Sequence, residues 1–223
     1  MGTEDRFKKQ QALNRERTEG SRIPRPGSLL IVTEGEKTEP LYLGGMRDYI
    51  KASYPKARLD ICVQGVGMGT VALVNKAIEI ANRAPAPYEN KWVCFDKDDF
   101  KDFDEAIALA GTFGFKVAWS NQAFEYWLYL HFYYAKSALH RDIWFEKVDE
   151  TLQAWGLGRY AKNMENMFSV FAADGRLKAA IRNAAQIRKE YQRKDIPPSQ
   201  RDPCTTVDEL VHSLEEYLDE FLK

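Results

Sequence analysis

Short apolar runs alternate with amphipathic segments over the first half of the chain. Four β-rich apolar runs are found, at 28–32, 57–63, 91–95 and 115–119. Three segments with apolar residues at helical spacing lie between them, at 40–53, 71–83 and 103–113. Strands that alternate with helices predict a doubly wound α/β unit with a mostly parallel sheet and right-handed crossovers.

The pattern beyond residue 133 predicts helices only. Helical spacing covers three segments, at 141–155, 163–173 and 175–193. A last helix is predicted from one apolar stripe, formed by Val207, Leu210, Val211, Leu214, Leu218 and Phe221. Thr206, followed three residues later by Glu209, predicts a capping box at the start of this helix. We therefore expect three parts: a flexible basic N-terminal arm at 1–27, an α/β domain at 28–133 and a helical C-terminal region at 134–223 packed on it.

Composition narrows the class of protein further. The chain has 223 residues, 44% hydrophobic and 29% charged, as in an ordinary globular protein. Cys62, Cys94 and Cys204 are odd in number and widely spaced, so neither a disulfide framework nor a zinc motif is indicated. No apolar run approaches the roughly 20 residues that span a bilayer. We expect a cytoplasmic protein with no membrane partner, and the net charge of -1 indicates no partner by itself.

Acidic residues follow two of the predicted strands. The first strand stops at Glu34, and the third ends in Asp96-Lys97-Asp98. Ligands of open parallel sheets collect beyond the carboxyl ends of the strands. If the extended geometry continues through Lys97, Asp96 and Asp98 point to the same side, and Glu34 joins them where the first and third strands are neighbours. These hard oxygen ligands predict a site for Mg²⁺ or Mn²⁺ that could polarise a phosphodiester.

These turns also allow other interpretations. Acids also serve as helix caps, so Asp96 and Asp98 alone leave both readings open, and Glu34 at a second strand end favours the metal site. The glycines at 65, 67 and 69 do not match a dinucleotide-binding fingerprint and favour a plain turn. Residues 35–38 do not match a Walker A loop, but Lys37 beside the acids could stabilise charge on a phosphate.

Several motifs together resemble the RloB family. They are 30–40 (LIVTEGEKTEP), 95–100 (FDKDDF), 120–127 (SNQAFEYW), 131–132 (HF) and 202–207 (DPCTTV). The resemblance implies a Toprim-like, Mg²⁺-dependent, nucleic-acid-processing fold related to OLD-type nucleases, found at prokaryotic anti-phage loci, with an ATPase partner of the RloA kind. Gln122 stands where the family usually has proline, and Asp202 where it usually has asparagine.

The resemblance also draws attention to residues after the fourth strand. It suggests Asn121 as a substrate-binding residue and Glu125 as a ligand of a second metal or as a residue that orients water. An acid in a first helical turn is also stabilised by the helix dipole, so a structural role for Glu125 stays open. His131 shares a face with Phe124 and Trp127, which predicts a buried structural histidine.

A basic stripe lies on the helix predicted at 175–193. It is formed by Lys178, Arg182, Lys189 and Arg193. Such a stripe can bind a phosphate backbone without reading its sequence, and a solvated helix face gives the same pattern. Both interpretations stay open, as they do for the basic N-terminal arm.

These observations lead to one main hypothesis and two alternatives. The main one is a metal-dependent nuclease, with Glu34, Asp96 and Asp98 as ligands, that cleaves RNA or DNA. RNA, and tRNA in particular, is suggested by analogy with related defence nucleases. The first alternative is a non-catalytic subunit that binds nucleic acid or an ATPase. The second is nucleotidyl transfer, for which no base-pocket signature is present; an oligomer is left open.

Overall fold

One mixed sheet of five strands runs through the protein. The computed structural model describes residues 25–57, 59–192 and 196–222. The strands are β1 (Arg25–Thr33), β2 (Asp60–Gly65), β3 (Tyr88–Asp96), β4 (Lys116–Asn121) and β5 (Cys204–Thr205). They lie in the order β2-β1-β3-β4-β5, the first four parallel and β5 antiparallel to β4. The predicted doubly wound α/β class is confirmed.

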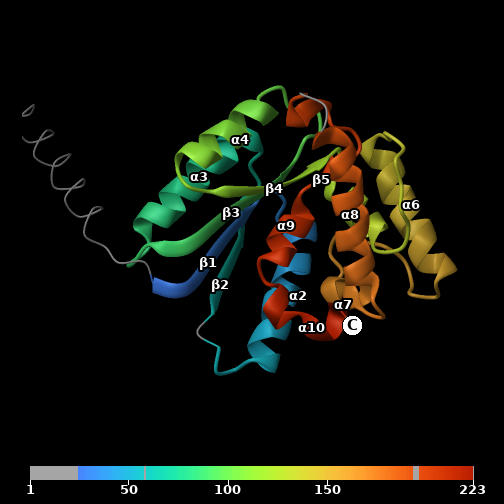
Figure 1. The fold of residues 1–223 in the computed structure, drawn as a ribbon, viewed down its shortest axis with the longest axis horizontal. Helices are drawn as coiled ribbons and strands as arrows, with labels where there is room; N and C mark the ends of the chain where they lie inside the picture. Colours follow the sequence, from blue (N-terminus) through green and yellow to red (C-terminus); the bar gives the residue numbers. More distant parts are fainter. Residues whose placement is uncertain (1–24, 58, 193–195, 223) are drawn as a thin grey trace, which may run out of the picture.

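Helices cover both faces of this sheet (Figure 1). They are α2 (Thr38–Ser53), α3 (Thr70–Arg83), α4 (Phe103–Thr112), α5 (Phe124–Leu130), α6 (Arg141–Ala154), α7 (Met167–Ala172), α8 (Arg176–Gln192), α9 (Val207–His212) and α10 (Asp219–Leu222). Two short 3₁₀ turns, η1 (Pro198–Gln200) and η2 (Glu215–Tyr217), complete the described part. No helix among the described residues is long and apolar enough to cross a membrane.

The alternation of side chains along β1 divides the core into two layers. Leu30 and Val32 pack with α3 and α4 on one face. Leu29 and Ile31 pack on the other face with α2 and the helices from α5 onwards. All four are buried, because successive residues of a strand point to opposite sides and both sides are covered here.

The predicted last helix is wrong. Its apolar stripe is largely buried, but the chain forms α9, η2 and α10 in place of one continuous helix. The predicted capping box is also wrong, because the Thr206 hydroxyl is used elsewhere. It accepts a hydrogen bond from the Trp119 N–H (2.9 Å) and donates one to the Val117 carbonyl (3.1 Å). Thr206 therefore fastens the C-terminal segment to β4.

The C-terminal region also adds a strand that the sequence pattern did not predict. Within the described part of that region, β5 pairs with β4, and α7, α8 and α9 share one apolar core with α2 and α5. The predicted boundary between residues 133 and 134 thus separates elements that share one sheet. The predicted N-terminal arm lies, up to residue 24, outside the described residues.

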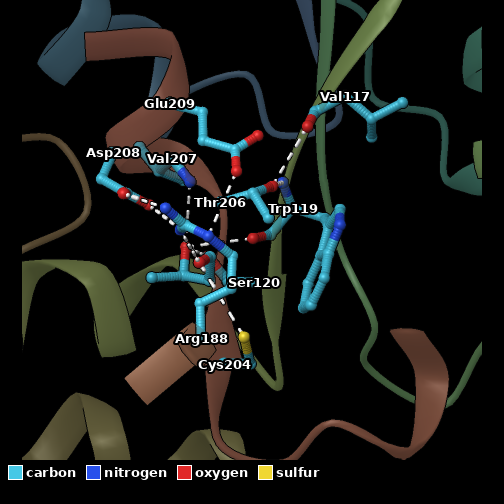
Figure 2. Close-up of polar contacts among 10 residues, drawn as sticks. Val117, Trp119, Ser120, Arg188, Cys204, Thr206, Val207, Asp208 and Glu209 are labelled. Carbon is cyan, nitrogen blue, oxygen red and sulfur yellow. Dashed lines mark hydrogen bonds and ion pairs between the residues drawn. The ribbon is translucent and has the colours of Figure 1, made fainter. Parts of the chain in front are cut away.

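A group of charges around the buried Asp208 joins α8 to α9, shown in Figure 2. We call Arg188, Asp208 and Glu209 the Arg188 cluster. The Arg188 guanidinium makes a two-pronged contact with Asp208 (2.5 and 2.7 Å) and an ion pair with Glu209 (3.1 Å). It also donates to the Thr205 carbonyl (3.2 Å) at the edge strand. Every group in this cluster thus has a partner of opposite charge.

Candidate active site

A cleft of about 570 Å³ opens at the carboxyl ends of β1 and β3. Its walls come from the turn after β1, the end of β3, the first turns of α2, α5 and α6, and the segment between α6 and α7. The helix after β1 covers one face of the sheet and the helix after β3 covers the other (Figure 1). The cleft therefore lies at the switch point where open α/β sheets bind ligands.

Glu34 and Asp96 meet in this cleft. Strands β1 and β3 are neighbours, as the sequence analysis required, and the Asp96 N–H donates to Oε2 of Glu34 (3.1 Å). The Asp96 carboxylate accepts the N–H of Phe124 at the start of α5 (2.9 Å). Two strand ends and a helix start are thus tied together by the two acids.

Two further buried acids extend this pair. Glu39, in the first turn of α2, accepts the Gly35 N–H (3.1 Å) and is 6% exposed. Glu125, in the first turn of α5, accepts the Tyr160 hydroxyl (2.9 Å) and is 4% exposed. Glu39 was not among the residues predicted from the sequence, although an acid in the first helical turn after a strand-end loop could have indicated it. We call Glu34, Glu39, Asp96 and Glu125 the carboxylate cluster.

Burial and mutual repulsion raise the pKa values of Glu34, Glu39 and Asp96. Burial, helped by the charges of Glu39 and Asp98, raises the pKa of Glu34 to about 7. The hydrogen bond from the Asp96 N–H acts in the opposite direction and lowers it. Burial, and then the charges of Glu39, Glu34 and Glu125, raises the pKa of Asp96 well above its usual range. The pKa of Glu39 is raised by burial and by Glu125. The nearby cations therefore do not offset burial and repulsion, and Glu34, Glu39 and Asp96 retain their protons to higher pH than exposed acids do.

Asp98 does not join the cluster in the predicted way. The chain leaves the extended conformation after Asp96: Asp98 has φ +42°, and its N–H donates to the Gln122 carbonyl (3.2 Å). Its carboxylate forms an ion pair with Arg141 at the start of α6, while Oδ1 is buried without a hydrogen-bond partner. The expectation of a continued strand through Lys97 is wrong, although Asp98 still lines the cleft.

The donors present suit a hard divalent cation in type. Carboxylate oxygens are the ligands that Mg²⁺ and Mn²⁺ prefer, and a bound cation would favour the ionised forms of Glu34 and Asp96 over the protonated ones. Among the described residues, however, no three Asp, Glu, His or Cys side chains converge closely enough to hold a metal ion as they stand. Glu34 and Asp96 fit such a site, whereas Asp98 fits only when its contact with Arg141 is released.

Three basic residues line the same cleft. Lys37, singled out from the sequence, is exposed in the turn before α2. Arg141 is committed to Asp98. Lys162 has its Nζ 3.7 Å from Oε1 of Glu125, and the sequence analysis did not select it. Since it lies outside the strand-end turns, no local pattern marks Lys162.

The other predicted substrate-binding residues lie away from the cleft walls. Asn121 is buried, and its side-chain amide donates to the Ser199 carbonyl (3.1 Å). Lys178, Arg182 and Lys189 are exposed on α8, as a solvent-facing stripe requires. Arg193 lies outside the described residues.

The predictions for His131 and the glycine loop can be compared with the structure directly. His131 is buried between the Tyr42 hydroxyl (2.9 Å) and the Trp127 carbonyl (3.0 Å), and burial lowers its pKa to about 3, which confirms a structural histidine.

A Cβ on Gly65 would lie 2.5 Å from the Gly35 carbonyl oxygen. Glycine is thus needed there because the loop packs against the Glu34 turn.

Fold and site together define a class: a doubly wound α/β protein with a buried acidic cleft at the switch point of its parallel strands. The model of the RloB-like protein family matches residues 29–214, most of the chain. The chain therefore belongs to the RloB-like family, as the motifs indicated. Neither the curated proteins nor the solved structures contain a match to it.

Proposed function

We propose that the chain is a Toprim-like, metal-dependent nuclease that hydrolyses phosphodiester bonds in RNA, with tRNA as one candidate, or in DNA, as part of prokaryotic anti-phage defence. The observation that carries the proposal is the meeting of Glu34 and Asp96 at the sheet switch point, where burial and neighbouring acids raise the pKa values of both. Acids in a cleft whose pKa values are strongly shifted by desolvation and by neighbouring charges are candidates for functional sites. The resemblance in sequence also suggests an ATPase of the RloA kind as a partner.

The proposal gives each residue of the cleft a distinct role. Glu34 and Asp96 would hold Mg²⁺ or Mn²⁺, and Asp98 would add a ligand on release from Arg141. When bound, such an ion polarises a phosphodiester and lowers the pKa of an attacking water. Glu125, fixed by Tyr160, would accept a hydrogen bond from that water.

Two groups of cations would hold the substrate. Lys37 at the rim of the cleft would offset phosphate charge, as the sequence analysis proposed. The exposed stripe of Lys178, Arg182 and Lys189 would contact the backbone further away in a salt-dependent manner. Asn121 has no place in this proposal, because its amide is already engaged inside the fold.

Cleavage assays with matched variants test the proposal. Purified protein is incubated with cellular RNA, supercoiled DNA and linear DNA, in Mg²⁺, Mn²⁺ or chelator. Asp96→Asn and Glu34→Gln keep the side-chain shape and remove the charge. We expect each to lower the cleavage rate at least about 100-fold, because mutation of a residue that only supports a metal ligand already lowers metal affinity or activity about 10–100-fold. The control Asp99→Asn removes an exposed carboxylate from the same loop and should leave the rate unchanged.

The results separate the possibilities cleanly. Loss of cleavage in both cluster variants, together with full activity of Asp99→Asn, supports the proposal and identifies the polymer that is cut. Cleavage that persists in both variants, or that chelator leaves unchanged, contradicts it.

A further inference from the structure

The segment between α6 and α7 is anchored beside the carboxylate cluster at two points. On its α6 side, the Asp149 carboxylate accepts the Tyr160 N–H (2.8 Å) and two N–H groups of the Arg159 guanidinium (3.1 and 2.8 Å). One acid thus fixes the backbone at residue 160 from a neighbouring helix. We call residues 159–162 the strap.

The second anchor is the Tyr160 side chain. It is 5% exposed, and its ring packs against Phe145 (5.0 Å between centroids) and Phe171 (6.4 Å). Its hydroxyl donates to Glu125 of the cluster (2.9 Å). Since backbone and side chain are both held, the strap has a defined position over the acids.

Lys162 stands two residues beyond this anchor and differs from the other cations of the cleft. Its Nζ lies 3.7 Å from Glu125, beyond hydrogen-bond length, and its side chain is 60% exposed. Arg141 forms an ion pair with Asp98, and Lys37 is exposed in the turn before α2. Lys162 is therefore a cation held at the cluster with its donors open toward the cleft.

We propose that Lys162 binds the substrate phosphate that lies next to the carboxylate cluster, and that Asp149 is the residue that positions it. The inference rests on the proposed function, whose substrate it places in the cleft. A phosphodiester that enters a cleft walled by buried acids meets repulsion, which a nearby ammonium group offsets. Lysine binds phosphate as a compact point charge, so it needs a fixed location more than a fixed orientation.

Equilibrium binding tests this role without requiring cleavage. In an Asp96→Asn background, fluorescence anisotropy measures the affinity for 5′-labelled single-stranded RNA and DNA oligonucleotides at low salt. We expect Lys162→Met to weaken binding of the preferred polymer at least about tenfold, and Lys162→Arg to restore most of it. Lys56→Met, which removes an exposed lysine beyond the far end of α2, should bind as the background does.

A double-mutant cycle tests the positioning role of Asp149. Asp149→Ala should weaken binding when Lys162 is present and have no further effect in Lys162→Met, because both changes then remove the same contact. A purely structural role for Asp149 would lower affinity equally in both backgrounds and would overturn this part.

The outcomes keep the inference separate from the proposed function. Unchanged affinity in Lys162→Met, an equal loss in Lys56→Met, or absence of binding to either polymer overturns the inference. If the cleavage assay still shows loss in Asp96→Asn and full activity in Lys162→Met, the nuclease proposal stands and only the role of Lys162 fails. If Asp96→Asn cleaves normally while Lys162→Met loses affinity, the nuclease proposal fails and the phosphate site stands.

Discussion

The Arg188 cluster and the carboxylate cluster both contain buried acids, but only in the first does a cation contact a buried acid at hydrogen-bond distance. Asp208 has a two-pronged contact with Arg188, whose side chain is itself only 14% exposed (Figure 2). Glu34 and Asp96, in contrast, have backbone N–H donors and other acids as neighbours. The first arrangement pairs its charges within the fold, and the second holds acids with raised pKa values whose protons a bound cation could displace.

This difference separates a structural from a functional use of buried charge. Removal of one partner from a closed pair leaves an uncompensated charge and destabilises the protein. Removal of an acid from a crowded group relieves repulsion and desolvation, so it should cost little stability or increase it. Opposite effects on stability and activity are thus expected at the two clusters.

The largest expected effect is on the Arg188 cluster. Arg188→Met should lower the free energy of unfolding by about 4 kcal/mol, because Asp208 stays buried without its partner. Urea denaturation followed by circular dichroism measures the change.

Two variants serve as controls for this prediction. Lys189→Met removes the exposed neighbour of Arg188 and should change stability by less than about 0.5 kcal/mol. Arg188→Met combined with Asp208→Leu removes both charges and should recover most of the loss. A wild-type-like midpoint for Arg188→Met alone would show that the pair is not the closed structural unit described here.

The contrast also explains what sequence patterns could predict. The meeting of Glu34 and Asp96 was predictable, because each follows a buried strand and parallel neighbours bring their ends to one edge. The pairing of Asp98 with Arg141 was not, because it joins positions 43 residues apart and depends on where α6 packs. The position of Lys162 at the cleft was not predictable for the same reason, because only the tertiary packing of the strap brings it there.

The fold, too, was predictable only where local sequence patterns determine the elements. The first four strands and their helices follow local periodicity, which the chain satisfies at every step. The short strand β5 has two residues, too few for any period, and is recognised only by its pairing with β4. The predicted last helix fails because α9, η2 and α10 bury most of the same apolar stripe without a continuous helix.

A smaller effect is expected from pH at the carboxylate cluster. The pKa of Glu34 is raised from 4.5 to about 7, so the native state keeps a proton that the unfolded chain releases between these values. The unfolded state then binds fewer protons, and the free energy of unfolding should fall by roughly 2 kcal/mol from pH 4.5 to 7 on account of this group. Glu34→Gln should flatten this dependence, as measured by urea denaturation at several pH values.

The matched control is the exposed neighbour Glu36. Glu36→Gln should keep the wild-type pH dependence of the free energy of unfolding, because the carboxylate that it removes is exposed to solvent. If Glu34→Gln keeps the same slope as the wild type over this window, the fold does not raise the pKa of Glu34, and the contrast between the clusters fails.

The smallest expected effect is the response to a divalent cation. An ion that binds only the native state raises its stability by RT ln(1 + [L]/Kd), about 1.4 kcal/mol at tenfold excess over Kd, or a rise in Tm of roughly 3–5 °C for a chain of this size. Millimolar Mg²⁺ or Mn²⁺ at pH 7.5 should raise the Tm of the wild type and, by the same amount, that of Arg188→Met, whose carboxylate cluster is intact. Asp96→Asn should lose this response, because one of the two acids that fit the cation no longer carries charge. A rise in Tm that persists in Asp96→Asn would place the cation outside the cleft, and equal Tm values with and without the ion in the wild type would remove the carboxylate cluster as a metal site.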